Sequence, residues 1–401
     1  MGLAAGAVAA ALLPHGVSAR PAPEEAMFDL PGRIKSPVKI ASVELLKTPQ
    51  CRLVRTTSTD GATGLAVTNE RIEDFWPVLL NRVAPFFVGK DARQIESLLD
   101  EVYTVGSNYK LAGLGFWVPV SFVEFSILDL LGRIAGQSVG QLLGGVVRPK
   151  VHVYMSSMRR DTTPQQEVDW LKKRYDQTGA KAIKIKIGGR MSNNADASPG
   201  RSEKLVALAR RTFGDDCTIY VDANGSYDAA HAIEVGKMLQ DHNVAFFEEP
   251  CPWEEYEETR KVTEALSIPV AGGEQDSSYW RLKEMIDRRV VDIIQPDVSY
   301  NGGIIRAIRI ANLAARAGMP ITPHSPKADP NEAYMLHFVS RTANAGPFQE
   351  YAAAGEPGKW YSPALEVKDG AIEVPTGPGL GISIDPSVLA GAQVIRRGGV
   401  L

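Results

Sequence analysis

Two lysines in the stretch at 182–187 are the first residues whose type and spacing suggest chemistry. Side chains alternate along a strand, so the three isoleucines of this stretch share one face while Lys184 and Lys186 share the other. Lysine is rarely buried without an anionic partner. Either this face is solvated, or the fold places carboxylates near the two ammonium groups.

Three carboxylates recur further along the chain at one spacing. Asp222, Glu248 and Glu274 each follow a short apolar stretch, and both intervals between them are 26 residues. Carboxylates held close together repel one another strongly unless a cation lies between them. An all-oxygen donor set favours a hard divalent ion, Mg²⁺ first and Mn²⁺ second. Separate surface acids paired with lysines are the alternative interpretation, and Glu249 is the alternative ligand to Glu248.

The series continues through Asp297, His324 and Glu350, at intervals of 23, 27 and 26 residues counted from Glu274. A carboxylate beside an imidazole orients the ring and raises its basicity, so Asp297 and His324 can form an acid–base pair. One ionisable residue therefore recurs at a similar place in each successive structural unit. The remaining histidines lie outside the series and are interpreted as structural.

The elements that must position these residues follow from the alternation of short apolar strands with amphipathic helices after Val151, at a period close to 26 residues. This alternation predicts an α/β fold with a (β/α)₈ or TIM-type barrel over residues 151–355. In such a barrel the C-terminal strand ends share one rim, where functional residues lie. Strands are expected at 151–156, 182–187, 218–222, 244–248, 269–271, 292–296, 320–323 and near 348–351, with helices at 165–178, 201–212, 229–241, 255–266, 278–288 and 303–317.

An α+β unit is expected ahead of the barrel, over residues 37–150. Strand patterns at 38–56 and 64–68 precede helical patterns at 70–103 and 120–131. Trp117 and Pro119 are expected in a loop before the second long helix. Residues 356–401 no longer follow the alternation of strand and helix.

The first 36 residues are expected to be a signal-like segment and a linker. Gly2–Leu13 is a run of small apolar residues followed by Val17-Ser18-Ala19, an order typical of an export signal and its cleavage site. A charged segment before the run is missing. We expect export to the periplasm if the signal is real, and a cytoplasmic protein if the run is a tail.

Composition limits the classes of partner. The net charge of −3 gives no reason to expect a nucleic-acid partner or an anionic membrane surface. The three cysteines lack the spacing of a disulfide framework or a zinc site. No apolar run approaches the roughly 20 residues that a membrane span needs. A small-molecule partner is therefore favoured.

The combination of these motifs resembles the enolase superfamily, and within it the mandelate racemase subgroup. The resemblance covers residues 38–386 and includes LLGG ahead of the barrel, Lys-x-Lys at 184–186, the ionisable series and VPTGPGLGISID near 374–385. It implies a modified barrel with an N-terminal α+β capping domain, which the C-terminal segment completes. It also implies Mg²⁺ on the three spaced carboxylates, a small carboxylate substrate and homo-oligomeric assembly.

The resemblance implies a role for each residue of the series. Lys186 is the base that removes the proton next to the substrate carboxylate, and Lys184 is the neighbouring charge that favours the neutral base and helps hold that carboxylate. Asp297 and His324 form the acid–base pair on the far side. Glu350, when protonated, donates a hydrogen bond to the enolate oxygen. Substrate contacts are expected from Asn224, Tyr154, Ser156 and Trp117.

An enolate formed in this way has three outcomes. Return of a proton gives racemisation or epimerisation, loss of a β-hydroxyl assisted by His324 gives a 2-keto-3-deoxy acid, and ring closure or opening gives cycloisomerisation. Dehydration of an acid sugar is the leading hypothesis, because many members of the subgroup with this set of residues are acid-sugar dehydratases. A racemase or epimerase of a 2-hydroxy acid is second. A catalytically silent, exported sugar-acid-binding barrel is the alternative from another class.

Overall fold

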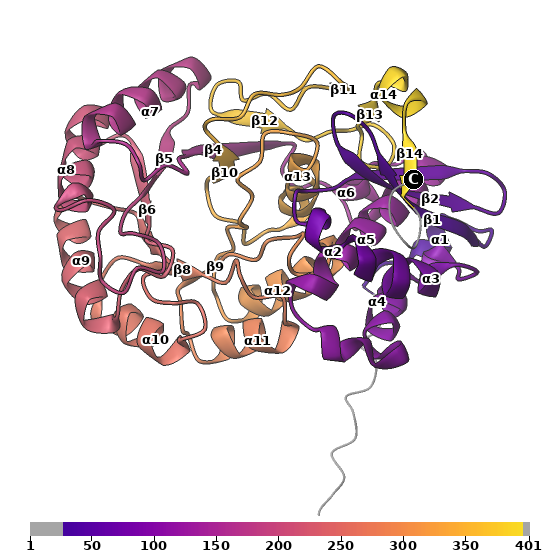
Figure 1. The fold of residues 1–401 in the computed structure, drawn as a ribbon, viewed down its shortest axis with the longest axis horizontal. Helices are drawn as coiled ribbons and strands as arrows, with labels where there is room; N and C mark the ends of the chain where they lie inside the picture. The colour runs from indigo at the N-terminus through magenta and orange to yellow at the C-terminus, as the bar shows by residue number, and fades with distance from the viewer. Residues whose placement is uncertain (1–26, 396–401) are drawn as a thin grey trace, which may run out of the picture.

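The structure, a computed structural model, describes residues 27–395 of the chain. A ring of strands surrounded by helices lies beside a smaller unit that contains a separate sheet (Figure 1). The predicted export signal lies outside the described residues.

The smaller unit is the predicted α+β cap. Its antiparallel sheet has the order β14-β1-β2-β3, and its longest helix packs against β3. Gly64 permits this close approach, since a Cβ atom there would lie 2.1 Å from the carbonyl oxygen of Ser126. The elements of the cap are β1 (Ile40–Lys47), β2 (Arg52–Ser58), β3 (Thr63–Val67), α1 (Leu30–Arg33), α2 (Ile72–Val78), a π-helix (Leu79–Val83), α3 (Ala84–Phe87), α4 (Ile95–Thr104), α5 (Leu114–Ala135) and α6 (Val139–Leu142), with 3₁₀ turns at Ala92–Gln94 and Val105–Leu111.

Two secondary-structure predictions in the cap, one of a helix and one of a loop, were wrong. The helical pattern at 70–103 is interrupted after Phe87, because the chain turns away so that the carbonyl of Lys90 can accept a hydrogen bond from the amide of Ile40 (2.9 Å). The predicted loop around Trp117 and Pro119 is instead part of α5. Burial of the apolar side chains there outweighs the one helical hydrogen bond that the proline removes.

Helix α5 is long and apolar enough to cross a membrane by length and composition, but 89% of its most apolar window is buried inside the protein. It is therefore the core helix of the cap, and it is the only helix of residues 27–395 that passes this test.

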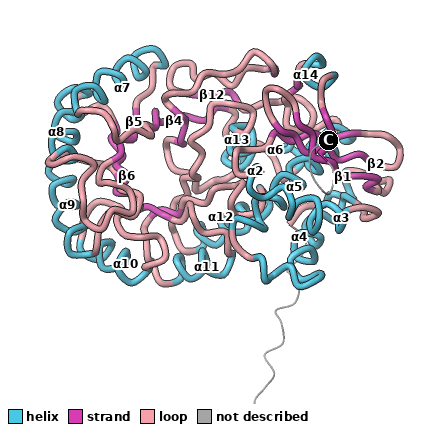
Figure 2. Tube along the Cα trace, viewed as in Figure 1, coloured by secondary structure: helices cyan, strands magenta, loops and turns pink. Residues whose placement is uncertain are grey.

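The larger unit is the predicted barrel. Its parallel sheet runs in the order β10-β4-β5-β6-β7-β8-β9, with helices outside it (Figure 2). The strands are β4 (Lys150–Ser156), β5 (Ala182–Lys186), β6 (Thr218–Asp222), β7 (Phe246–Glu248), β8 (Val270–Gly272), β9 (Ile293–Ile294) and β10 (Gln349–Ala352). The helices are α7 (Pro164–Thr178), α8 (Arg201–Phe213), α9 (Ala229–Asp241), α10 (Tyr256–Ala265), α11 (Tyr279–Asp287), α12 (Ile304–Arg316) and α13 (Glu332–Arg341).

The seventh predicted strand, at 320–323, is reduced to single bridges. Ile321 pairs in parallel with Ile294 of β9 and with Ala345, just ahead of β10. The ring is thus completed by isolated bridges at this point, which is a modified form of the barrel.

Inside the ring, apolar side chains form a floor beneath the predicted rim. Tyr154, Ala182, Tyr220, Phe246 and Ala271 form one buried cluster. Because side chains two residues apart share a strand face, the next inward positions toward the strand ends are polar, among them Ser156, Lys184, Asp222 and Glu248.

The C-terminal segment returns to the cap, as the resemblance implied. It comprises β11 (Tyr361–Ser362), β12 (Ala371–Glu373), β13 (Ser383–Ile384), α14 (Pro386–Ala390) and β14 (Gln393–Ile395). Strand β12 pairs antiparallel with the start of β4, and β14 pairs antiparallel with β1 through Leu45 and Ile395.

A buried acid ties the cap to the barrel. Glu124 of α5 accepts hydrogen bonds from the backbone amides of Ile304 (2.9 Å) and Ile305 (2.8 Å), at the start of α12. Gly303 permits this contact, since a Cβ atom there would lie 2.4 Å from the Glu124 carboxyl group. The cap is therefore anchored at the strand-end face of the barrel.

Candidate active site

The two lysines of β5 face the interior of the barrel. Lys184 is fully buried and Lys186 is 2% exposed. In the parallel ladder Lys186 is paired with Asp222, which is paired in turn with Glu248. The alternative of a solvated strand face is therefore excluded, and the carboxylates that the lysines require are on the next two strands.

The three equally spaced carboxylates converge. One oxygen from each of Asp222, Glu248 and Glu274 lies within 4.8 Å of the others, and all three residues are buried. Oε2 of Glu274 has no hydrogen-bond partner although it is buried. Three hard oxygen donors, one of them unsatisfied, fit a divalent cation such as Mg²⁺ or Mn²⁺.

The ammonium groups lie against these carboxylates. Nζ of Lys184 lies 2.7 and 2.8 Å from the carboxylate oxygens of Glu248 and 2.8 Å from Oε1 of Glu350. Burial lowers the pKa of Lys184, but Glu248 and Glu350 outweigh it and hold the pKa well above its ordinary value. Lys186 contacts Oδ2 of Asp222. The two lysines thus neutralise different carboxylates.

Neighbouring charges and burial shift the pKa values of the triad carboxylates in opposite directions. Burial raises the pKa of Asp222, but Lys186 and Lys184 reverse that shift and hold the pKa well below its usual range. Burial and the charge of Asp222 raise the pKa of Glu248 to about 8, against the opposing effect of Lys184. Crowded negative charge at this rim is what a bound cation relieves.

The predicted acid–base pair is formed. Nδ1 of His324 lies 2.9 Å from Oδ2 of Asp297, whose other oxygen accepts hydrogen bonds from the amides of Ser299 (2.7 Å) and Tyr300 (3.0 Å). Nε2 of His324 faces Glu274 at 3.5 Å. Burial lowers the pKa of His324, but Glu274 and Asp297 outweigh it and raise the pKa to about 9. The two neighbouring carboxylates therefore favour the protonated form of the imidazole.

Glu350 lies at the rim, where it pairs with Lys184. Its carboxylate accepts hydrogen bonds from Ser156 Oγ (2.7 Å) and the amide of Ser325 (3.0 Å), and it pairs with Lys184. Burial raises the pKa of Glu350, but Lys184 and His324 outweigh it and hold the pKa at about 2. In this arrangement the ion pair with Lys184 favours the ionised form of Glu350, and the role that requires its protonated form stays a prediction.

Asn224, a predicted substrate contact, lies beyond the end of strand β6. It lies in the turn after β6 with a left-handed φ of 43°. Its Nδ2 donates to Asp222 Oδ2 (3.1 Å) and Glu249 Oε2 (3.3 Å), and its Oδ1 accepts from Arg160 (2.8 Å). Asn224 therefore orients one carboxylate of the triad.

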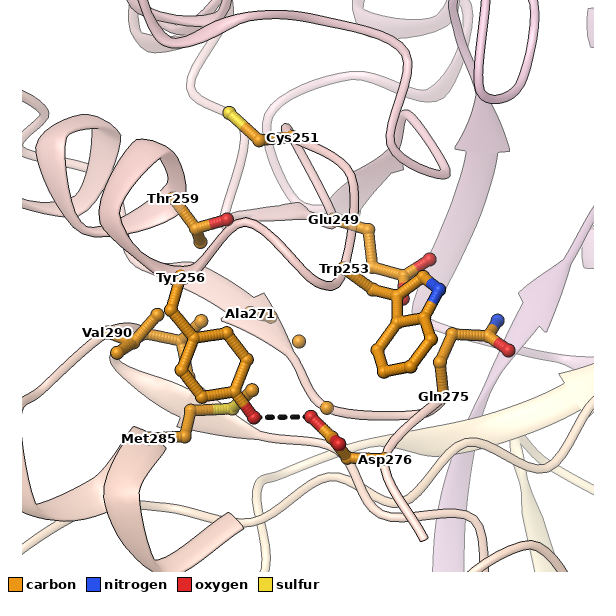
Figure 3. Close-up of a pocket in the computed structure, with 13 residues that line it drawn as sticks. Glu249, Cys251, Trp253, Tyr256, Thr259, Ala271, Gln275, Asp276, Met285 and Val290 are labelled. Carbon is orange, nitrogen blue, oxygen red and sulfur yellow. Dashed lines mark hydrogen bonds between the residues drawn. The ribbon is translucent and has the colours of Figure 1, made fainter. Parts of the chain in front are cut away.

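Glu249 is outside the convergent triad. It lines a small pocket together with Trp253 and Gln275 (Figure 3). Its carboxylate oxygen Oε1 is buried without a hydrogen-bond partner. Burial, with the charges of Glu274 and Asp222, raises the pKa of Glu249 well above its usual range. The geometry favours Glu248 as the ligand.

Three predicted substrate contacts lie against other protein groups, and their contact with a substrate stays a prediction. Tyr154 belongs to the apolar floor, and its ring lies 5.4 Å from Nζ of Lys184. Ser156 donates to Glu350. Trp117 stacks on Tyr103 with ring centroids 5.3 Å apart and lies 3.5 Å from the Arg306 guanidinium. We place Trp117 in the packing between cap and barrel, because burial within α5 leaves it 4% exposed.

Several polar groups of the site were missed from the sequence. Gln295 donates to Glu248 Oε2 (3.0 Å), and its position two residues before Asp297, by strand alternation, was a usable signal. Arg160 and the amide of Ser325 come from loops after strand ends. No periodic pattern marks such positions, so the sequence offered no signal for them.

Comparisons with known proteins agree with this geometry. Residues 166–388, more than half of the chain, match the family model described as Enolase C-terminal domain-like. Arabinonate dehydratase from Saccharolobus solfataricus is 30% identical over 309 residues, which cover 76% of this chain and 79% of that protein. D-galactarolactone cycloisomerase from Agrobacterium fabrum is 28% identical over 317 residues, which cover 76% and 81%.

A solved structure has the same fold. The mandelate racemase/muconate lactonizing protein from Paracoccus denitrificans, solved in complex with magnesium, superposes with a TM-score of 0.82 at 26% identity. The match covers 90% of this chain and all of that protein.

Proposed function

The chain belongs to the enolase superfamily, within its mandelate racemase subgroup, and on that premise we propose that it dehydrates an acid sugar to a 2-keto-3-deoxy acid. The first step is removal of the proton next to the substrate carboxylate, and the second is loss of the neighbouring hydroxyl group as water. The substrate is a small sugar-derived carboxylate.

One observation carries the proposal. Lys186 contacts Asp222 on one side of the carboxylate triad, and His324 faces Glu274 at 3.5 Å on another side. Two groups that transfer protons therefore flank one candidate metal site, and β4 and β10 lie between the two segments of the ring that carry them. A protein that only binds acid sugars has no need of this pair. The 30% identity to an arabinonate dehydratase supports dehydration over the other outcomes.

The residues of the chain divide the chemistry as follows. Lys186, in its neutral form, accepts the α-proton as the carbon–hydrogen bond breaks. His324, oriented by Asp297, gives its Nε2 proton to the departing β-hydroxyl, which leaves as water, and the enol product becomes the 2-keto acid. Lys184 supplies a fixed positive charge beside the reacting carboxylate.

Asp222, Glu248 and Glu274 are the residues that would hold Mg²⁺. When bound, the ion stabilises negative charge that develops on the substrate carboxylate.

Product analysis tests the proposal. The protein is incubated with Mg²⁺ and a panel of aldonic and aldaric acids, and 2-keto-3-deoxy acids are measured. We expect one acid to give this product, and we expect His324→Asn to lose it. The proposal fails if no acid in the panel yields a keto product.

A racemase, epimerase or cycloisomerase is the second candidate. The same two proton-transferring groups support it, together with 28% identity to a galactarolactone cycloisomerase. A product that is an isomer of the substrate, with no water lost, identifies this outcome in the same assay.

A further inference from the structure

Three side chains beside the site are not explained by proton transfer at the triad. Arg71 comes from the cap, just before α2, Tyr300 from the loop between β9 and α12, and Lys327 from the loop that follows His324. The Tyr300 ring lies 6.0 Å from the His324 ring. Arg71 hydrogen-bonds the Tyr300 hydroxyl. A group of residues from both units therefore borders the catalytic histidine.

Lys327 is held in place by its backbone, while its ammonium group has no partner. Its amide donates to the carbonyl of Ser325 (2.7 Å), and its carbonyl accepts from the amide of Ala352 (3.0 Å). Within residues 27–395 the structure gives its Nζ no hydrogen bond and no ion pair. Burial lowers the pKa of Lys327, but Asp297 and Tyr300 outweigh it and leave the pKa above its ordinary value. The ammonium group is thus charged and unpaired.

Arg71 is also incompletely satisfied, because its Nε is buried without a hydrogen-bond partner. The residues next to it, Asn69, Glu70 and Ile72, line a cavity of about 370 Å³ together with Asp329 of the barrel. Glu70 and Asp329 are exposed, and they act on Lys327 electrostatically without forming an ion pair with it. Within the described residues, Nε of Arg71 and Nζ of Lys327 therefore have no hydrogen-bond partner at the border between cap and barrel.

We propose that Arg71 and Lys327 bind the end of the substrate remote from the reacting carboxylate, and that this end is a second carboxylate. The inference rests on the proposed function and narrows its substrate class to dicarboxylic (aldaric) acids. A buried donor left without a partner, such as Arg71 Nε, is costly, and a carboxylate can pair with a guanidinium and an ammonium group together. A terminal hydroxyl group satisfies fewer of these donors and carries no charge.

Binding to a chain that cannot turn over tests the inference. Lys186→Ala, loaded with Mg²⁺, is titrated calorimetrically with matched hexaric and hexonic acids, which differ only at the remote carbon. We expect the diacid of at least one pair to bind on the order of tenfold more tightly. Adding Arg71→Gln or Lys327→Met should reduce that preference to about threefold or less. Lys237→Met, at an exposed lysine of α9, is the matched control and should leave the preference unchanged.

Two results overturn the inference, namely equal binding of diacid and monoacid in every pair, and a preference that survives in both variants. A failure of the proposed function is separate. If no acid exchanges its α-proton with solvent in the wild-type chain, the proposed dehydration is wrong. The ratio of diacid to monoacid affinity still decides whether the protein binds a carboxylate at the remote end.

Discussion

The two sides of the catalytic rim are built by different means. On the side of β5 to β7, Lys186, Asp222 and Glu248 are neighbours in one regular parallel ladder. On the opposite side, the segment before His324 pairs only through isolated bridges, and the His324 ring is held by Asp297. Glu350 lies in the parallel ladder of β10 with β4 and also bonds Ser156 and Ser325. Strand register therefore fixes the first side, whereas the position of His324 on the second side depends on individual contacts. We therefore expect substitutions on the first side to abolish metal binding or activity, and substitutions on the second side to reduce activity by different degrees.

The largest effect is expected from the carboxylate triad. Glu274→Gln keeps the size of the side chain but replaces one of the three carboxylates of the triad with a neutral amide. We expect Mg²⁺ affinity, measured by calorimetry, to fall by about 100-fold or more. Substitution of residues that only hydrogen-bond to metal ligands already lowers metal affinity by about 10- to 100-fold. Glu366→Gln, at an exposed acid, is the control. Unchanged Mg²⁺ affinity in Glu274→Gln contradicts the assignment of this residue.

On the second side, Asp297→Asn should separate the two chemical steps. Loss of the charge that orients His324 should slow formation of the keto acid by about 100-fold, a typical contribution of a positioned acid. Exchange of the α-proton, which Lys186 performs, should change by less than about threefold. Both rates are followed by proton NMR in D₂O. An equal fall in the two rates argues for a general structural defect.

The two histidines that are buried within residues 27–395 offer a related contrast. Carboxylates surround His324, whereas the described residues give His337 of α13 two hydrogen-bond partners, the amide of Gly140 (3.3 Å) and the carbonyl of Leu380 (3.0 Å). Burial lowers the pKa of His337 to about 4. The folded chain therefore binds fewer protons than the unfolded chain at this residue between pH 4 and the unfolded pKa of about 6.5.

The stability from His337 should thus be complete above about pH 6.5 and should fall as the pH drops toward 4, by about 3 kcal/mol in all. Urea unfolding at several pH values measures it. His337→Gln, which can keep both hydrogen bonds, should flatten this part of the pH dependence. His231→Gln, at a partly exposed histidine, should not. Parallel pH profiles for wild type and His337→Gln refute the assignment.

The smallest effect is expected from Ser156→Ala. It removes the 2.7 Å hydrogen bond to Glu350 but leaves Lys184 and the amide of Ser325 in place. We expect kcat to fall by only about fivefold, in line with roughly 1 kcal/mol for one hydrogen bond. Ser97→Ala on α4, whose hydroxyl bonds only the carbonyl of Gln94, is the control. A loss as large as that of Asp297→Asn means that Ser156 also contacts the substrate.

The same contrast explains how far the sequence predicted the molecule. The spacing of the ionisable series predicted strands that end at Asp222 and Glu248 and shortly before Glu274 and Asp297, because each βα unit has nearly constant length. Strand alternation placed Lys184 and Lys186 on one face, and the structure shows that this face is buried. Where the structure depends on tertiary contacts, the sequence was less informative. The ion pair of Glu350 with Lys184 carried no sequence signal, and the loop predicted around Trp117 was wrong because burial favours the helix α5 there. Lys327 and Arg71 come from irregular segments that carry no periodic signal.

The central claim is that Lys186 removes the proton next to the substrate carboxylate. Deuterium incorporation at that carbon, followed by NMR in D₂O with Mg²⁺ and the acid that the wild-type chain turns over, tests it most directly. The account predicts incorporation with the wild-type chain and with His324→Asn, and none with Lys186→Ala. Incorporation that persists in Lys186→Ala would contradict it.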